Sequence, residues 1–226
     1  MTRHTFLRLS ALGLLTGPLL FTFGDLVRRL VEPSGTSSAA DISRAVAEHQ
    51  AAWQFAAILA LLSGPLLVLG VAGLALDARG RGGRTTLVGI WMVAIGAFAS
   101  IGHAVAFYAP YALYDRAGVS SSVMKALDDA SERYAPLVAL IVLFIVGMML
   151  GSIVLIVGLR RARKVPVWSA VAAVVFVAAG SSGGVLAGVV GVMAALAAFG
   201  PAARSLVEPA VPAAQDRTGR EATLPG

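Results

Sequence analysis

Long apolar runs dominate this sequence, at residues 9–24, 53–76, 86–107, 137–159 and 167–200. A helix that crosses a hydrocarbon layer about 30 Å thick needs on the order of 20 apolar residues, and most of these runs reach or approach that length. Charged residues make up only 13% of the chain, against roughly 25% in a soluble globular domain. The sequence therefore predicts an all-α, polytopic transmembrane helix bundle over residues 1–205 and a disordered tail over 206–226.

The run at 167–200 is too long for one span, because a single helix of that length would measure about 51 Å. Residues 180–184, with the sequence GSSGG, lie near its middle, and glycine permits a tight reversal there. We expect a hairpin of two short spans, 167–179 and 185–200, which makes six spans in all. The alternative is a broken or re-entrant segment that lines a cavity.

The first two apolar runs share a short internal repeat. The sequence LLTGPLL at 14–20 returns as LLSGPLL at 61–67. Because the second copy lies in the middle of a span, we interpret the first as a retained span and not as a cleaved signal peptide. A proline kinks its helix, so two kinked neighbours either open a cavity between them or simply pack together.

Basic residues are concentrated in the short gaps, and cytoplasmic loops are the ones rich in Lys and Arg. Six spans with both termini cytoplasmic place twelve of the 18 Lys and Arg residues inside. We expect a multi-pass protein of a bacterial inner membrane. Its expected partner is the lipid bilayer, and we expect it not to bind nucleic acid. The inner loops hold Arg79, Arg81, Arg84, Arg160, Arg161, Arg163 and Lys164.

Ionisable groups inside or beside spans are candidates for function, because burying them is costly. Here they gather at the predicted outer end, as Asp25, Glu48, His49 and His103. On helices, Ser100, His103 and Phe107 share a stripe, as do His49 with Trp53 and Gln50 with Gln54. We predict a polar, aromatic-rimmed pocket between spans 1–3. The alternative is an ordinary interfacial belt of aromatic and hydrated acidic residues. The expected substrate-binding residues are Trp53, Gln54, Phe107, Tyr108 and Tyr111.

Cofactor chemistry has little support in the sequence. The absence of cysteine excludes thiolate catalysis, Fe–S clusters and Cys-based zinc sites. The outer segment 128–132, DDASE, resembles the acidic motif with which soluble terpene synthases hold magnesium, but it is also a good start for a helix. His49 and His103 are a single pair, whereas membrane cytochromes use repeated histidines for haem. We expect no metal and no cofactor.

Two family resemblances follow from these residues. Residues 39–49, with Phe55 and the second span, are similar to a group of small six-span bacterial membrane proteins known only as a domain of unknown function. The likeness covers about residues 9–160 and implies no activity. In size, span number and acids beside aromatics, the chain also resembles integral-membrane terpene cyclases. That resemblance implies protonation of an isoprenoid by a carboxylic acid and stabilisation of the carbocation by aromatic faces.

On that resemblance Glu48 or Asp25 is the general acid, with His103 and His49 beside it. The alternative is a non-enzymatic membrane protein that binds a partner, a lipid or an apolar small molecule. The sequence predicts no particular oligomeric state.

Overall fold

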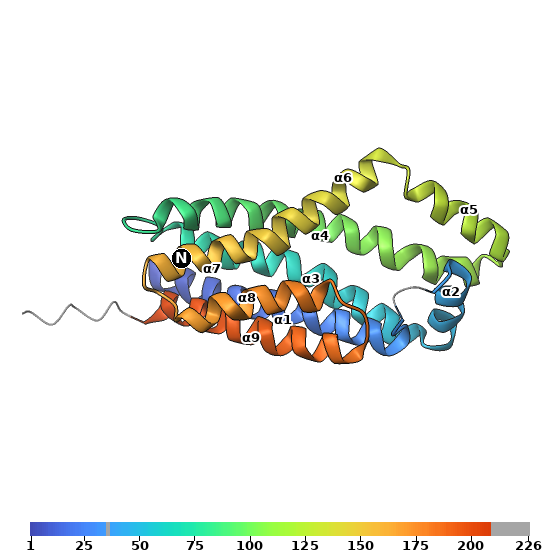
Figure 1. Cartoon of the computed structure of the whole chain (residues 1–226), viewed down its shortest axis with the longest axis horizontal. Coiled ribbons are helices and arrows are strands. Elements are labelled where there is room, and N and C mark those ends of the chain that lie inside the picture. The colour runs from blue at the N-terminus through green and yellow to red at the C-terminus, as the bar shows by residue number, and fades with distance from the viewer. Residues whose placement is uncertain (35–36, 209–226) are drawn as a thin grey trace, which may run out of the picture.

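The computed structural model describes residues 1–34 and 37–208, and every regular element in these residues is a helix (Figure 1). This confirms the predicted all-α class. One segment is π-helical and joins its neighbours into the continuous helix Ala135–Arg161. In chain order the elements are α1 (Arg3–Val31), α2 (Ala39–Glu48), α3 (Gln50–Ala75), α4 (Gly83–Arg116), α5 (Ser121–Ser131), α6 (Ala135–Phe144), η1 (Ile145–Leu150), α7 (Gly151–Arg161), α8 (Val167–Gly180) and α9 (Val185–Val207).

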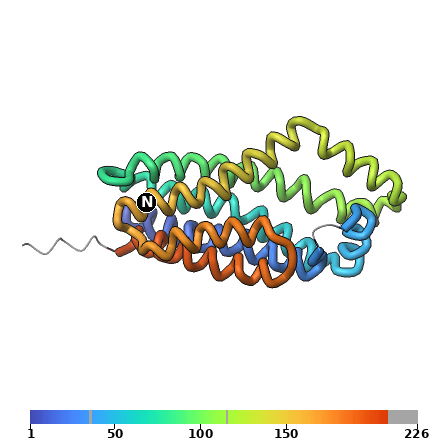
Figure 2. Tube along the Cα trace, in the orientation of Figure 1, coloured from blue at the N-terminus to red at the C-terminus, as the bar shows by residue number. Residues whose placement is uncertain are grey.

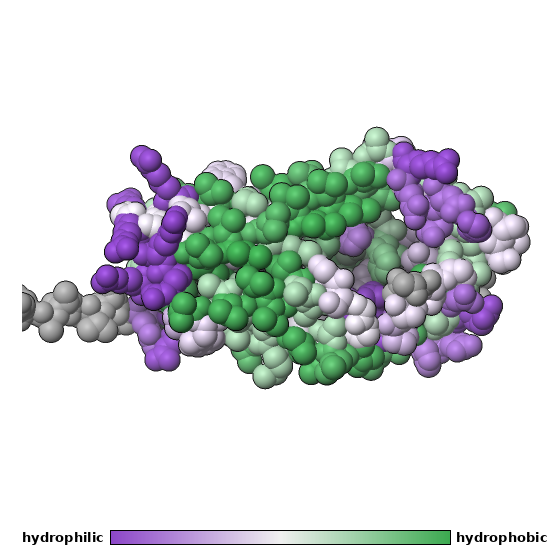
Figure 3. All heavy atoms as spheres, in the orientation of Figure 1, coloured by the Kyte–Doolittle hydropathy of each residue, from purple (hydrophilic) through white to green (hydrophobic). Residues whose placement is uncertain are grey.

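Large apolar side chains cover the lateral surface of the molecule. Trp91 and Phe98 on α4, for example, are 68% and 65% exposed. Figure 3 shows an apolar band between two polar ends. Monomeric soluble proteins rarely expose contiguous apolar patches above a few hundred Å², so the chain is a multi-pass helical membrane protein. Five segments are long and apolar enough to cross a membrane: Arg3–Val31, Gln50–Ala75, Gly83–Tyr114, Ala135–Arg161 and Val185–Val207.

Several helices extend beyond the apolar runs that predicted them. The run at 9–24 lies within α1, and the run at 86–107 lies within the 34 residues of α4. At about 1.5 Å per residue, α4 is roughly 51 Å long and projects past a hydrocarbon layer of about 30 Å. Helix α9 likewise continues to Val207, past the predicted end of the bundle at 205. Residues 209–226 of the predicted tail lie outside the described residues.

The run at 167–200 folds as two helices that pack against each other. Gly184 has a φ of +87°, a left-handed conformation that glycine adopts without strain, and it ends the reversal between α8 and α9. The chain therefore reverses at the predicted place, but the two arms are unequal and only α9 is among the five segments long enough to cross a membrane. That α8 is also a span stays a prediction. Helix α8 has 14 residues and is about 21 Å long, whereas α9 has 23 residues.

The two copies of the internal repeat lie against each other where α1 packs on α3. A Cβ added to Gly17 would lie 2.8 Å from the Leu67 nitrogen, and one added to Gly70 would lie 2.4 Å from the Leu14 nitrogen. Such close backbone approach leaves no room for a cavity at this contact. Of the two expectations for the kinked helices, close packing is the one found.

The elements divide the molecule into two ends (Figures 1 and 2). The N-terminus, the 76–82 loop, the 162–166 loop and the end of α9 lie at one end, which we call the basic end. The opposite end carries α2 and α5, and the junction between α8 and α9 lies on the same side of the bundle, short of that end. We call this end the outer end after its predicted orientation. The core cluster at this outer end consists of Val31, Val46, Trp53, Ala56, Ala60, Ala104 and Tyr108.

Candidate functional site

A cavity of about 300 Å³ lies between the helices near the outer end. Figure 3 shows a hollow in this part of the face, with hydrophilic atoms at depth inside an otherwise apolar surface. Apolar, aromatic and charged side chains all contribute to its wall. Its lining residues are Phe21, Asp25, Arg28, Ala60, Ser100, His103, Ala104, Phe107, Tyr108, Phe144, Met149 and Gly180.

Helix α4 contributes one wall through the stripe that the sequence predicts. Ser100, His103 and Phe107 are spaced i, i+3 and i+7 and all line the cavity. His103 stacks on Phe144 of α6, with centroids 4.8 Å apart and planes at 17°. Its centroid is also 6.0 Å from that of Phe107. This wall therefore presents aromatic faces beside a single imidazole.

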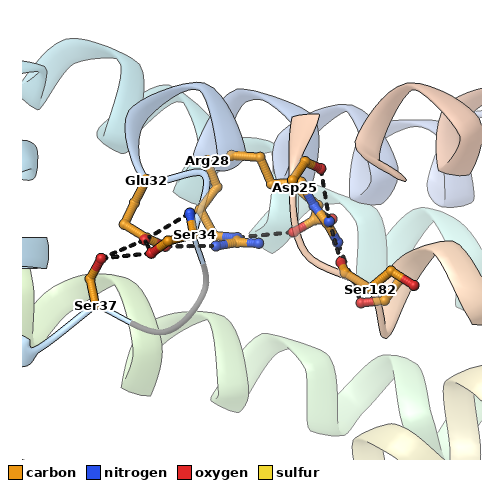
Figure 4. A network of polar contacts seen from close by, with 9 residues as sticks. Asp25, Arg28, Glu32, Ser34, Ser37 and Ser182 are labelled. Atoms are coloured by element: carbon orange, nitrogen blue, oxygen red, sulfur yellow. Dashed lines mark hydrogen bonds and ion pairs between the residues drawn. The ribbon is translucent and has the colours of Figure 1, made fainter. Parts of the chain in front are cut away.

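Helix α1 contributes the charged wall. The Asp25 carboxylate accepts one hydrogen bond from Arg28 Nε at 2.9 Å and another from Arg29 Nε at 2.6 Å. The Arg28 guanidinium also lies 3.8 Å from Glu32 and 5.9 Å from the centroid of Phe107. Figure 4 shows this network along one side of α1. Two acids and two bases balance here, so the wall offers donors and acceptors without net charge.

Arg29 connects this wall to the hairpin of α8 and α9. Its side chain is almost fully buried and donates to the carbonyls of Ala179 at 3.2 Å and Gly184 at 3.1 Å, and also to Ser182. The last carbonyls of a helix lack N–H donors within it, and a cation there also interacts well with the helix dipole. Arg29 therefore caps α8 and fixes the hairpin against α1.

Sequence reasoning missed Arg28 and Arg29, which it counted only as charges of an outer loop. The signal was their spacing, because Asp25 precedes them by three and four residues and side chains at these offsets meet on a helix.

Glu32 extends the polar network toward the outer end. Its carboxylate accepts hydrogen bonds from the backbone nitrogen of Ser34 at 3.1 Å and the hydroxyl of Ser37 at 2.9 Å. The Ser34 hydroxyl also donates to it. Ser34 and Ser37 are thereby tied to the end of the helix (Figure 4).

Trp53 packs beneath the cavity and does not line it. Its side chain is 1% exposed, and its Nε1 donates to the Tyr108 carbonyl at 2.9 Å. Its ring contacts those of Phe107, Tyr108 and Tyr111. Its face of α3 turns toward the core of the outer end, so Trp53 lies behind the lining residues Phe107 and Tyr108.

Glu48, His49 and Gln54 are exposed and do not line the cavity. The prediction treated the segment from Glu48 to Gln54 as the start of one span. In the structure α2 ends at Glu48, and the backbone changes direction at His49, where φ is −125° and ψ is 38°. Of the two predicted acids, only Asp25 reaches the cavity. Of the two predicted histidines, only His103 does.

A second, smaller cavity of about 140 Å³ lies on the other side of the His103 and Phe107 side chains. Tyr111, predicted to bind substrate, lines this cavity, and its hydroxyl lies 3.4 Å from the Asp128 carboxylate. The pair His103 and Phe107 thus separates two hollows. The lining is completed by Ala106, Pro110, Tyr114, Leu127, Ser131, Leu137 and Ile141.

The acidic segment 128–132 is engaged in local contacts. Lys125 pairs with Asp129 at 3.0 Å, and the hydrogen bond with Asp129 raises the pKa of Lys125. Asp128 faces Tyr111. Among the described residues, no group of three His, Cys, Asp or Glu side chains lies close enough together to hold a metal ion.

Comparisons with known proteins identify no relative, because no protein family, no curated protein and no solved structure matches this chain.

Proposed function

We propose that this protein binds an apolar small molecule or lipid chain that carries one polar, uncharged end, in the cavity between α1, α3, α4, α6 and α8. The observation that supports the proposal is the composition of the lining. Most of it is apolar or aromatic, and a few polar side chains, Asp25, Arg28, Ser100 and His103, line the same cavity. Ligand pockets have this character and measure roughly 300–1,000 Å³.

The charge balance supports an uncharged polar end. Asp25 and Arg28 satisfy each other at 2.9 Å, so a ligand with a net charge would find no unpaired counter-ion there, and burying such a charge is costly. A hydroxyl, epoxide or carbonyl can instead exchange hydrogen bonds with Asp25, Arg28 or His103. An isoprenoid-like alcohol fits this description, with its chain against Phe21, Phe107 and Phe144.

A second proposal for the same cavity is protonation-initiated cyclisation of an isoprenoid. The aromatic faces support it, because rings attract a developing cation. Asp25 would be the acid, and the aromatic rings of Phe107 and Tyr108 would surround the substrate. Both oxygens of Asp25 accept hydrogen bonds from arginine, so this chemistry requires Asp25 to leave at least one of those bonds before it donates a proton.

One experiment tests both proposals. Membranes containing the protein are incubated with farnesyl- and geranylgeranyl-bearing alcohols and epoxides, and the repurified protein is extracted and analysed by mass spectrometry. Binding predicts retention of the compound by the wild-type protein. It also predicts reduced retention by Ala104→Leu, which fills the cavity, and unchanged retention by Ala178→Leu, whose alanine is exposed.

Cyclisation predicts in addition an isomer of unchanged mass, which is lost in Asp25→Asn and retained in Glu48→Gln. The second variant is the matched control, because Glu48 is an exposed acid outside the cavity. A folded protein that retains none of the compounds would contradict both proposals.

We also propose that the chain crosses a bacterial inner membrane six times, with both termini in the cytoplasm. In support, the basic end carries Arg3, Arg8, Arg79, Arg81, Arg84, Arg160, Arg161, Arg163, Lys164 and Arg204, as the positive-inside rule expects of a cytoplasmic face.

A further inference from the structure

At the basic end, a cleft of about 440 Å³ lies between the 76–82 loop, the first turn of α4 and the end of α7. No apolar side chain lines it. Its residues are Gly80, Arg81, Gly82, Arg84, Thr85 and Arg161. Three arginines from two separate parts of the chain thus face one hollow.

The loop is built so that these arginines meet. Gly80 and Gly82 have φ values of +67° and +81°, which favour glycine. A Cβ on Gly82 would lie 2.6 Å from the Gly158 carbonyl oxygen, so the loop rests directly on α7. Lys164 fixes the loop from the other side, because its Nζ lies 2.6 Å from the Asp77 carboxylate.

The arginines of the cleft are not neutralised. In residues 1–34 and 37–208, no carboxylate forms an ion pair with Arg81, Arg84 or Arg161, and the nearby Asp77 is engaged by Lys164. Arg161 Nη1 donates only to the Thr85 hydroxyl, at 3.3 Å. Exposed like charges repel one another, so an anion that lies between the three arginines lowers their electrostatic energy.

Backbone donors open on the same cleft. At the start of α4, the nitrogens of Gly83 and Thr86 bond to the carbonyls of Gly80 and Gly82. Within the described part of the chain, the N–H groups of Arg84 and Thr85 have no acceptor. Arginine side chains beside free N–H groups at a helix start are the donors with which proteins bind phosphate.

The cleft lies at the level of the membrane surface. Trp91 is 68% exposed and follows Arg84 by seven residues, which is two turns along the same face of α4. Exposed tryptophan marks the boundary between hydrocarbon and headgroups. A phosphate in the cleft would therefore lie among the lipid headgroups.

We propose that this cleft binds a phosphate group, through Arg81, Arg84 and Arg161, that is supplied either by the headgroup of an anionic phospholipid or by free phosphate. The site is separate from the cavity at the outer end and does not depend on the function proposed for that cavity.

The test is native mass spectrometry of the full-length protein, which is released from detergent in the mass spectrometer. In one arm the sample contains phosphatidylglycerol or phosphatidylcholine of the same chain length. In a separate arm it contains inorganic phosphate. The cleft variant is Arg81→Gln with Arg161→Gln. The control is Arg3→Gln with Arg204→Gln, which removes the same charge from the same end without touching the cleft. Thermal unfolding of both variants establishes that they are folded.

We expect the wild type and the control to retain phosphatidylglycerol over phosphatidylcholine. The cleft variant should bind it about 25-fold more weakly, at about five-fold for each arginine removed. Phosphate adducts without a lipid preference, lost in the cleft variant, would support the same site with free phosphate as its ligand. Equal loss in both variants would overturn the proposal, because general charge would then explain the binding. Absence of both lipid preference and phosphate adducts would also overturn it.

Discussion

Arg29 is a charged side chain that lies deep in the bundle, at 1% exposure. It joins three elements, because it pairs with Asp25 on α1 and donates to carbonyls at the end of α8 and at the end of the hairpin turn, just before α9. Removing one partner of a buried ion pair leaves the other charge uncompensated and typically costs about 3–5 kcal/mol. We therefore expect Arg29→Gln to lower the free energy of unfolding by about that amount, measured by SDS titration in mixed micelles.

Arg28→Gln is the matched control. Arg28 is more exposed than Arg29 and donates to no carbonyl of the hairpin, so its loss should cost distinctly less. Equal destabilisation by the two substitutions would contradict the capping role of Arg29.

The stripe of Ser100, His103 and Phe107 could be predicted from sequence because helical spacing alone puts these side chains on one face. The contacts of Arg29 could not be predicted from sequence, because its carbonyl partners are about 150 residues away in the chain. The exposed position of Glu48 at the end of α2 could not be predicted for a local reason. A polar segment before an apolar run gives no sign that the helix stops and turns at His49.

At the scale of helices, glycines set how closely α1 and α3 approach. A Cβ on Gly70 would lie 2.4 Å from the backbone nitrogen of Leu14, and backbone atoms cannot yield as a flexible side chain does. We expect Gly70→Ala to separate the helices and to destabilise the protein by about 1–3 kcal/mol, as measured by SDS titration.

Gly200 on α9 provides the opposite case. No atom lies within 4 Å of a Cβ added there, and alanine favours a helix by about 1 kcal/mol over glycine. Pro201 follows, and its ring disfavours helical backbone at a preceding residue that has a Cβ, which offsets part of this gain. Gly200→Ala should therefore change stability far less than Gly70→Ala. The packing account fails if both substitutions have effects of the same sign and size.

Apolar runs predicted most membrane-length helices, because the length of a span is imposed by the bilayer. They did not predict η1, where the run at 137–159 turns π-helical over six residues. A Cβ on Gly147 would lie 2.6 Å from Gly96 Cα, so the contact with α4 depends on a glycine pairing that only tertiary structure reveals. Met149 of this segment lines the cavity, and π-helical turns are frequent at functional sites.

At the scale of the whole molecule, the two ends differ in the charge they carry, and this difference underlies the proposed orientation. The chain contains no cysteine, so single cysteines report location without interference. We expect Ser120→Cys, at the outer end, to react with an impermeant thiol reagent in intact cells, and Arg79→Cys, at the basic end, to react only after the cells are opened. The reverse pattern would invert the topology.

The division into two ends could be predicted from the positions of Lys and Arg. The sequence predicts a pocket between the first three spans, whereas the cavity in the structure is also lined by Phe144, Met149 and Gly180 from α6, η1 and α8. No local pattern indicates that the Arg29 contacts bring the α8–α9 hairpin beside α1, and without that contact the place of Gly180 in the lining cannot be deduced.

The most direct measurement of the central claim is photo-crosslinking with a diazirine-bearing farnesyl alcohol, followed by peptide mapping of the labelled sites. Binding in the cavity predicts labels on His103, Phe107 and Phe144. These labels should be displaced by excess unlabelled alcohol and reduced in Ala104→Leu. Labels spread over the lipid-facing side chains Trp91 and Phe98, undiminished by competitor, would show that the alcohol only dissolves around the bundle and would contradict the account.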